Sequence, residues 1–190
     1  VISTDKFNNF INDPKLIKNL KESYFHHLER FNFKESFITD KAPLNFRWIG
    51  FIKILFPNAK IIHSLRNPKD NCLSLYKNLF EGGLSFSYDE KELGTYYNLY
   101  LELMDFWNEL LPNTIYHAKY EKIITDQETE TRKIINFCNL SWEDNCLSFH
   151  KNKTPIKTMS TAQARQPIYK SSLNSYEKFS PFLQTLNKII

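Results

Sequence analysis

The sequence predicts an α/β fold, in which helices cover both faces of a mainly parallel sheet. Two observations lead to this prediction. Short apolar runs of strand length, such as 61–65 and 114–118, alternate along the chain with stretches of helical periodicity. The chain has 190 residues, enough for one domain with a sizeable core. We therefore expect a single three-layer domain over residues 1–190, with right-handed crossovers and a ligand crevice at the carboxyl ends of the strands.

The elements before residue 60 follow from local signals. A helix is expected over residues 14–31, because Asp13 can cap it, Pro14 fits its first position and apolar residues recur on one face. Residues 36–39 (SFIT) are predicted to form a short strand. Asn45 can then cap a helix that ends near residue 56.

The most informative stretch is 56–80, FPNAKIIHSLRNPKDNCLSLYKNLF. It predicts a strand at 61–65 that ends at Arg66, then a helix capped by Asn67. Unpaired N–H groups of the first helical turn and the Arg66 guanidinium could together bind an anion. Ser74 projects from the same helix face as the cap and could share that anion. Alternatively, Arg66 pairs with Asp70 or with a carbonyl at the end of the sheet, and Ser74 is an ordinary helix residue.

The second half of the chain continues the alternation of helices and strands. A long amphipathic helix is expected over residues 90–111, with Tyr97, Leu101, Met104 and either Trp107 or Leu111 on its apolar side. The later elements are a strand at 114–118, a helix at 126–140, a polar loop at 157–169 and a short helix at 181–190.

Composition excludes several functional classes. The 25 basic and 21 acidic residues give a net charge of +4, which suits an anionic ligand but is far from a nucleic-acid-binding stripe. No apolar run has the length of a membrane span. The three cysteines have neither metal-binding nor redox spacing, so we expect reduced, buried thiols, no metal and a cytoplasmic location.

Glycine is scarce, and none of the four glycines lies in a phosphate-binding glycine loop. The chain begins with Val1, and no strand is predicted before residue 36. We therefore expect that an N-terminal strand, loop and helix of the fold lie upstream of this sequence.

The segment RNPKD followed by CLSLY, directly after a strand, resembles the 3′-phosphate-binding segment of sulfotransferases. These enzymes take a sulfuryl group from 3′-phosphoadenosine 5′-phosphosulfate (PAPS). The resemblance implies that Arg66 and Ser74 bind the 3′-phosphate. The runs DKAPLNF and IGFIKILFPNAKIIHSLRNP are similar to bacterial tetratricopeptide-linked sulfotransferases and, more loosely, to tyrosylprotein sulfotransferases. This similarity implies that Lys41 faces the sulfate and the leaving phosphate.

Two later motifs extend the resemblance. Tyr120-Glu121 resembles the family's YE motif, in which the tyrosine lines the adenine pocket. The run KTMSTAQARQPIY resembles the loop that closes over the nucleotide, which implies that Ser160 contacts the sulfate or phosphate and Arg165 the 3′-phosphate side. One departure lies at 171–176 (SSLNSY), where the family usually has Ser-Ser-x-Gly-Arg-Trp. Ser175 replaces the expected basic residue, for which Lys170 or Lys178 could compensate.

The resemblance implies a P-loop-like sandwich that transfers a sulfuryl group from PAPS to a hydroxyl or amine of a glycan, peptide or metabolite. It also implies a 5′-phosphosulfate loop upstream of this chain, and tetratricopeptide repeats could precede it. The alternative is a truncated or degenerate module that binds the nucleotide or the acceptor without turnover. A P-loop kinase is disfavoured, because the sequence contains neither a Walker lysine nor a magnesium-binding acid after a strand.

Overall fold

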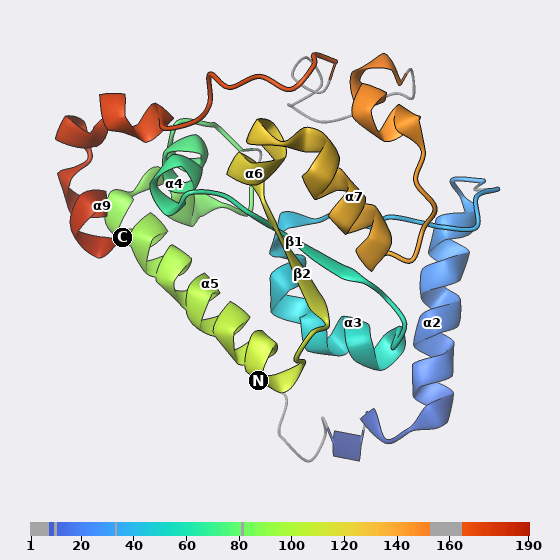
Figure 1. The fold of residues 1–190 in the computed structure, drawn as a ribbon. Coiled ribbons are helices and arrows are strands. Elements are labelled where there is room, and N and C mark those ends of the chain that lie inside the picture. Colours follow the sequence, from blue (N-terminus) through green and yellow to red (C-terminus); the bar gives the residue numbers. More distant parts are fainter. Residues whose placement is uncertain (1–7, 10, 33, 81, 153–164) are drawn as a thin grey trace. The chain divides into compact units, whose positions relative to one another are not determined.

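The structure is a computed structural model that describes residues 8–9, 11–32, 34–80, 82–152 and 165–190. It divides into two compact units, Val1–Ala59 and Lys60–Ile190. Figure 1 shows the order of the elements along the chain. No helix in the described ranges combines the length and the apolar character needed to cross a membrane.

The first unit is helical. It contains α2 (Pro14–Glu29), the 3-10 helix η1 (Pro43–Trp48) and α3 (Ile49–Leu55). The prediction for α2 is confirmed, since the Asp13 carboxylate accepts hydrogen bonds from the N–H groups of Lys15 and Leu16. The rings of Tyr24 and Phe25 pack on Phe56, with ring centroids 5.2 and 5.7 Å apart. These aromatic contacts connect α2 to the residue that follows α3.

The prediction of a strand at 36–39 is wrong. Residues 37–39 have no regular secondary structure, and Phe37 and Ile38 are 68% and 43% exposed. A strand is stable only when its backbone groups pair with another strand, and a local apolar run does not provide that partner. The next helix also differs from its prediction, because it starts as a 3-10 turn at Pro43 before it becomes α3.

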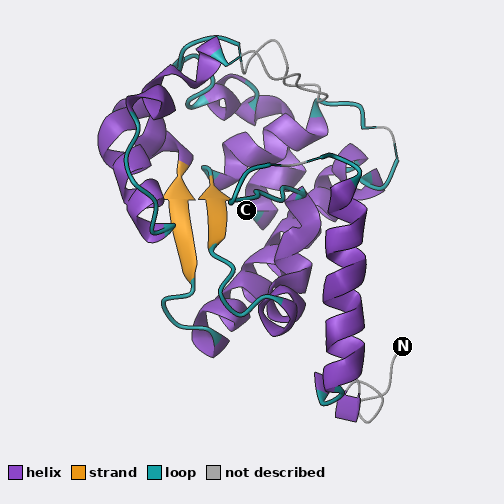
Figure 2. Ribbon diagram, turned by 90° about the vertical axis from the view of Figure 1, so that its right-hand side faces the viewer, coloured by secondary structure: helices purple, strands orange, loops and turns teal. Residues whose placement is uncertain are grey.

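The second unit contains a small parallel sheet. Strand β1 (Ile61–Leu65) pairs in parallel with β2 (Ile115–Lys119), as Figure 2 shows, and His63 lies opposite His117 in the register. The chain between these strands forms α4 (Pro68–Tyr76), the 3-10 helix η2 (Ser85–Tyr88) and α5 (Glu90–Leu110). The predicted α/β class with a parallel sheet is confirmed at this level.

Short helices follow β2. They are α6 (Tyr120–Thr125), α7 (Gln127–Phe137), η3 (Asp144–Lys151), η4 (Ser175–Lys178), η5 (Ser180–Phe182) and α9 (Gln184–Ile189). The helix expected over 126–140 corresponds to α7, and α6 was not predicted. Helices contact both faces of the sheet, since the His63 side chain meets Tyr100 of α5 and the Tyr116 ring packs on Phe137 of α7.

The core of the second unit joins α4, α5 and the C-terminal segment. Its buried side chains are Cys72, Leu73, Leu93, Tyr97, Tyr176, Leu183 and Leu186. Burial raises the pKa of the Cys72 thiol to about 12. All three cysteines are free, but only Cys72 is buried as predicted, since Cys138 and Cys146 are half-buried. Met104 is buried as expected, but Leu101 is 38% exposed, so its predicted inward position is wrong.

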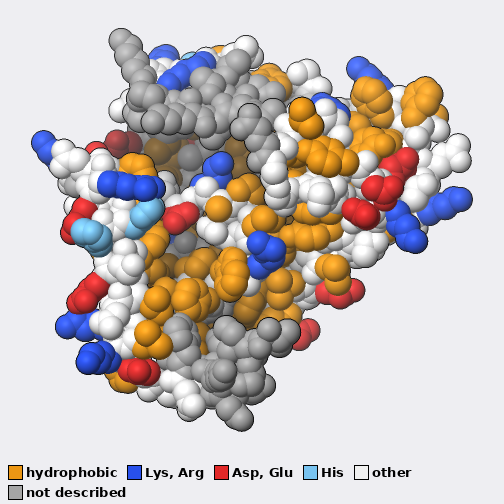
Figure 3. Space-filling view, turned by 180° about the vertical axis from the view of Figure 1, so that it is seen from behind, with side chains coloured by type: hydrophobic (Ala, Val, Ile, Leu, Met, Phe, Trp, Pro, Cys, Tyr) orange, Lys and Arg blue, Asp and Glu red, His pale blue; other side chains and the backbone are white. Residues whose placement is uncertain are grey.

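Large apolar side chains also lie on the surface of both units. Examples are Phe25 and Trp48 in the first unit and Leu79 and Phe182 in the second, all at least half exposed. Figure 3 shows apolar side chains over much of one face. Much of the surface of any folded protein is apolar, so these side chains do not by themselves define a site.

Candidate functional site

The junction between β1 and α4 carries the residues that the sequence analysis emphasised. Asn67 caps α4, since its side-chain oxygen accepts hydrogen bonds from the N–H groups of Lys69 and Asp70. The backbone N–H of Asn67 donates in turn to the carboxylate of Glu121, at 2.7 Å. The expectation that unpaired N–H groups of the first turn bind the anion is therefore wrong. Pro68 has no N–H, and these other donors already have acceptors.

Arg66 is the cation of this junction. Its Nη2 donates to the backbone carbonyl of Ser172 at 2.6 Å, and its guanidinium lies 5.0 Å from the centre of the Tyr120 ring. The Nε atom is buried and has no hydrogen-bond partner in the described part of the chain. A buried N–H of a guanidinium without an acceptor is costly, so this atom is the natural donor for a bound anion.

Tyr120 and Ser172 complete the surroundings of Arg66. The Tyr120 hydroxyl and the Ser172 hydroxyl are hydrogen-bonded at 2.5 Å, so Ser172 contacts Arg66 through its carbonyl and Tyr120 through its side chain. Tyr120 begins α6, directly after β2, whereas Arg66 directly follows β1. The parallel pairing of β1 and β2 thus brings the two residues together at the carboxyl ends of the strands.

Asp70 lies one turn beyond Arg66 and is almost fully buried, at 2% exposure. It does not pair with Arg66, as one alternative had suggested. Its carboxylate instead accepts hydrogen bonds from the N–H groups of Asn174 and Tyr176, both at 2.8 Å, and from the Ser175 hydroxyl at 3.0 Å. Asp70 therefore binds the same C-terminal segment whose Ser172 contacts Arg66.

The remaining predicted nucleotide-binding residues have different outcomes. Ser74 is half-buried in the second turn of α4. Arg165 is also half-buried, in a turn that precedes the segment with Ser172. Ser160 lies outside the described residues. Lys170 and Lys178, which could replace the basic residue missing at position 175, are both exposed.

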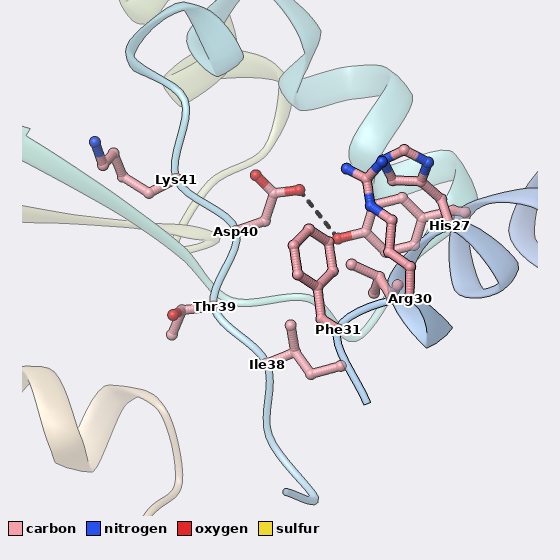
Figure 4. Close-up of a pocket in the computed structure, with 9 residues that line it drawn as sticks. His27, Arg30, Phe31, Ile38, Thr39, Asp40 and Lys41 are labelled. Atoms are coloured by element: carbon pink, nitrogen blue, oxygen red, sulfur yellow. Dashed lines mark hydrogen bonds between the residues drawn. The ribbon is translucent and has the colours of Figure 1, made fainter. Parts of the chain in front are cut away.

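Lys41 belongs to the first unit and precedes η1. It is exposed and lies at the edge of a pocket of ≈ 320 Å³ whose lining includes Tyr24, His27 and Asp40. Asp40 accepts a hydrogen bond from the Tyr24 hydroxyl at 3.0 Å. Burial, and next this hydrogen bond, raise the pKa of the Tyr24 hydroxyl. Figure 4 marks this hydrogen bond of Asp40 with a dashed line and shows the Lys41 side chain pointing away from it.

The described residues contain no cluster of three or more metal-ligating side chains. Of the residues that the sequence analysis assigned to the site, the structure brings Arg66 and Tyr120 together, in the second unit. Sequence reasoning had not assigned a role to Ser172, whereas Asp70 was considered only as a first-turn acid and a possible partner of Arg66, and Glu121 only as part of a motif. Their partners lie 54 to 106 residues away along the chain, so no local pattern could have identified those contacts.

Comparison with known proteins identifies the family of this chain. The family model described as "Sulfotransferase family" matches residues 9–144. The chain belongs to the sulfotransferase family. The matched region contains Lys41, Arg66, Ser74 and Tyr120, and it ends before Ser160 and Arg165. The family prediction is thus confirmed, whereas the link to tetratricopeptide proteins stays a prediction.

Two relatives are similar to this sulfotransferase-family chain. An "Uncharacterized protein" of Aquifex aeolicus (strain VF5) is 33% identical over 181 residues, which cover 94% of this chain and 24% of that protein. A protein of Caenorhabditis briggsae named "Putative protein-tyrosine sulfotransferase" is 25% identical over 114 residues, covering 60% of this chain and 41% of that protein. The chain therefore spans less than half of the length of either relative.

Proposed function

We propose that this protein transfers the sulfuryl group of PAPS to a hydroxyl or amine of an acceptor. The observation that carries the proposal is the Arg66 guanidinium, which has a buried Nε without a partner in the described ranges and a neighbouring Nη2 fixed by the Ser172 carbonyl. A planar guanidinium presents its N–H groups in a rigid fork that matches the oxygens of a phosphate. The 3′-phosphate of PAPS fits this donor.

The other nucleotide contacts extend from Arg66. Ser74 supplies a hydroxyl to the 3′-phosphate, and Arg165 supplies a second cation on the same side. Tyr120 already stacks with the Arg66 guanidinium, and in the proposed complex its ring also borders the adenine. Ser175, which stands where a basic residue was expected, has no positive charge, and its hydroxyl donates to Asp70. Arg66 therefore carries a larger share of 3′-phosphate binding than it would if position 175 also held a basic residue.

The reaction forms one bond to sulfur and breaks another. The acceptor oxygen or nitrogen attacks the sulfur in line with the bond that joins it to the 5′-phosphate. That S–O bond breaks, its electron pair stays on the phosphate oxygen, and the acceptor proton passes to a base. Lys41 stabilises the charge that develops on the leaving phosphate, and Ser160 positions the transferred group. Positioning and electrostatics supply the catalysis, as they do in phosphoryl transfer.

The proposal has structural and cellular parts as well. The fold is a three-layer, P-loop-like sandwich, which is supported by the contacts of α5 and α7 with opposite faces of the parallel pair. The three free cysteines support a cytoplasmic location. The acceptor is a glycan, a peptide or a small metabolite, and the name of the Caenorhabditis relative favours testing peptide tyrosines first.

A transfer assay on the full-length protein tests the proposal. Sulfur-labelled PAPS is incubated with a panel of tyrosine peptides, glycans and amines, and both 3′-phosphoadenosine 5′-phosphate (PAP) release and acceptor labelling are measured. We expect labelling that Lys41→Ala lowers at least about 100-fold, as for loss of a group that stabilises developing charge. The control Lys34→Ala changes another exposed lysine of the first unit and leaves labelling unchanged.

Two outcomes would contradict the proposal. Binding of PAP without labelling of any acceptor would favour the alternative, a nucleotide-binding module without turnover. Labelling that Lys41→Ala leaves intact would show that another group stabilises the leaving phosphate.

A further inference from the structure

We propose that Asp70 is the positioning residue for 3′-phosphate recognition, because it fixes the C-terminal segment that holds Arg66 in place. This inference rests on the proposed function. Asp70 is the only buried acidic or basic residue within the ranges that the structure describes. No salt bridge to it is found there either, so the partners that the structure gives its carboxyl group are hydrogen-bond donors.

Three donors from one short segment surround this carboxylate. Oδ2 accepts from the N–H of Asn174, and Oδ1 accepts from the N–H of Tyr176 and from the Ser175 hydroxyl. Asn174 has a φ of 54° and a ψ of 25°, in the left-handed region, which turns the backbone so that its N–H and that of Tyr176 reach the same acceptor. Successive N–H groups around a left-handed residue form a concavity that binds anions. Asp70 fills that concavity.

The segment is fixed on both sides of this contact. Beyond it, Tyr176 is 4% exposed and packs in the core with residues of α4 and α5. Before it, Ser172 accepts from Arg66 Nη2 through its carbonyl and is hydrogen-bonded to Tyr120 through its hydroxyl. Asp70 and Arg66 are only four residues apart on the same strand-to-helix junction. The carboxylate therefore sets the position of the Ser172 carbonyl relative to the guanidinium.

This arrangement assigns separate tasks to the N–H groups of Arg66. Nη2 is committed to Ser172, while Nε has no partner among the described residues and is left for the phosphate. If the segment moves, Nη2 loses its acceptor and the guanidinium is free to rotate. Recognition of the 3′-phosphate then weakens, whereas contacts with the rest of the nucleotide stay the same.

The test compares two carboxylates that hold the C-terminal segment in similar ways. Asp70→Asn removes one acceptor and places an amide N–H against a backbone donor. Glu90→Gln is the matched control, because Glu90 begins α5 and accepts the N–H of Leu186 at 2.9 Å, in contact with α9 rather than Arg66. For each full-length variant, the dissociation constants of PAP and of adenosine 5′-phosphate are measured by calorimetry, together with the melting temperature.

The expected result is a change in selectivity. In Asp70→Asn the preference for PAP over adenosine 5′-phosphate falls about tenfold, as for partial loss of a charge-assisted hydrogen bond. In Glu90→Gln the preference is unchanged, although both variants melt at lower temperature. Ser175→Ala removes one of the three donors to Asp70 and keeps both backbone hydrogen bonds, so it lowers the preference for PAP only two- to threefold. This variant replaces Asp70→Asn in the test if Asp70→Asn does not fold.

The outcomes separate this inference from the proposed function. A wild-type protein without preference for PAP over adenosine 5′-phosphate contradicts the proposed function itself. A wild-type protein with that preference, which Asp70→Asn or Ser175→Ala then retains in full, shows that Asp70 only stabilises the fold and overturns the inference.

Discussion

Two histidines that face each other across the small sheet make stability depend on pH. The Nδ1 atoms of His63 and His117 are 2.9 Å apart, and His117 Nε2 lies 3.0 Å from the Asn108 side-chain oxygen. His117 therefore donates to Asn108 and accepts from His63, whose Nε2 accepts from the Tyr100 hydroxyl at 2.5 Å. Each hydrogen-bond site is filled when both rings are neutral. An added proton has no acceptor between the rings.

Burial, and next the neighbouring His117, lower the pKa of His63 from 6.5 to about 4. Between these two values the unfolded chain binds more protons than the folded one, so stability rises with pH and is lost as pH falls from about 6.5 toward 4. At pH 5 the free energy of unfolding is lower than at pH 7.5 by about 2 kcal/mol when the whole shift of the His63 pKa is counted. Solvent screening of the partly exposed ring reduces this difference to about 1 to 2 kcal/mol.

Urea unfolding at pH 7.5 and pH 5 measures this loss. We expect His63→Asn to be less stable than the wild type at pH 7.5 but to lose about 1 to 2 kcal/mol less on acidification. His27→Asn, which changes an exposed residue of α2, is the control and keeps the wild-type difference in unfolding free energy between pH 7.5 and pH 5. Equal losses in the wild type and in His63→Asn would refute the reasoning, as would an NMR titration of the His63 ring with a midpoint near 6.5.

Two substitutions test the packing and backbone of the second unit by thermal unfolding. A Cβ at Gly94 would lie 2.6 Å from Cγ2 of Ile189, so Gly94→Ala should lower the free energy of unfolding by about 1 to 3 kcal/mol. Adding Ile189→Ala to the same chain should relieve this clash. An unchanged melting temperature in Gly94→Ala would argue against the contact. Asn174 has a φ of 54°, so Asn174→Ala should cost about 1 kcal/mol and Asn174→Gly almost nothing. Equal effects of the two substitutions would contradict the left-handed assignment.

Local signals in the sequence predicted the ends of several elements well. The caps at Asp13 and Asn67 were identified from the sequence, and both side chains accept the expected N–H groups. The strand 61–65 agrees with β1 residue by residue. These features depend on interactions within a few residues, which a single sequence displays directly.

Features that depend on distant partners were predicted less well. The apolar run at 36–39 lacks a strand to pair with, and Leu101 lies on the apolar side of its helix by periodicity but is exposed. The sequence also indicated free N–H groups at the start of α4, where Asn67 and Glu121 supply the acceptors. A helical period predicts which side chains share a face, whereas the fold decides which faces are covered.

The candidate site also separates features that the sequence could predict from features that depend on distant residues. Arg66 and Tyr120 were named from motifs 54 residues apart, and the structure brings the guanidinium over the ring. The roles of Asp70 and Ser172 could not be predicted, because both arise from contacts with residues more than a hundred positions away along the chain. Motif resemblance thus named Arg66 and Tyr120, and the structure identified Asp70 and Ser172 as part of their surroundings.

The most direct test of the central claim is the coupling between the Arg66 side chain and the 3′-phosphate. Calorimetry gives four dissociation constants, for PAP and adenosine 5′-phosphate with the wild type and with Arg66→Ala. We expect a coupling energy of about 1.5 to 3 kcal/mol, seen as a loss of PAP affinity with little change for adenosine 5′-phosphate. Arg132→Ala, which changes an exposed arginine of α7, is the control and gives no coupling. If Arg66→Ala weakens the binding of both nucleotides by the same factor, Arg66 does not recognise the 3′-phosphate.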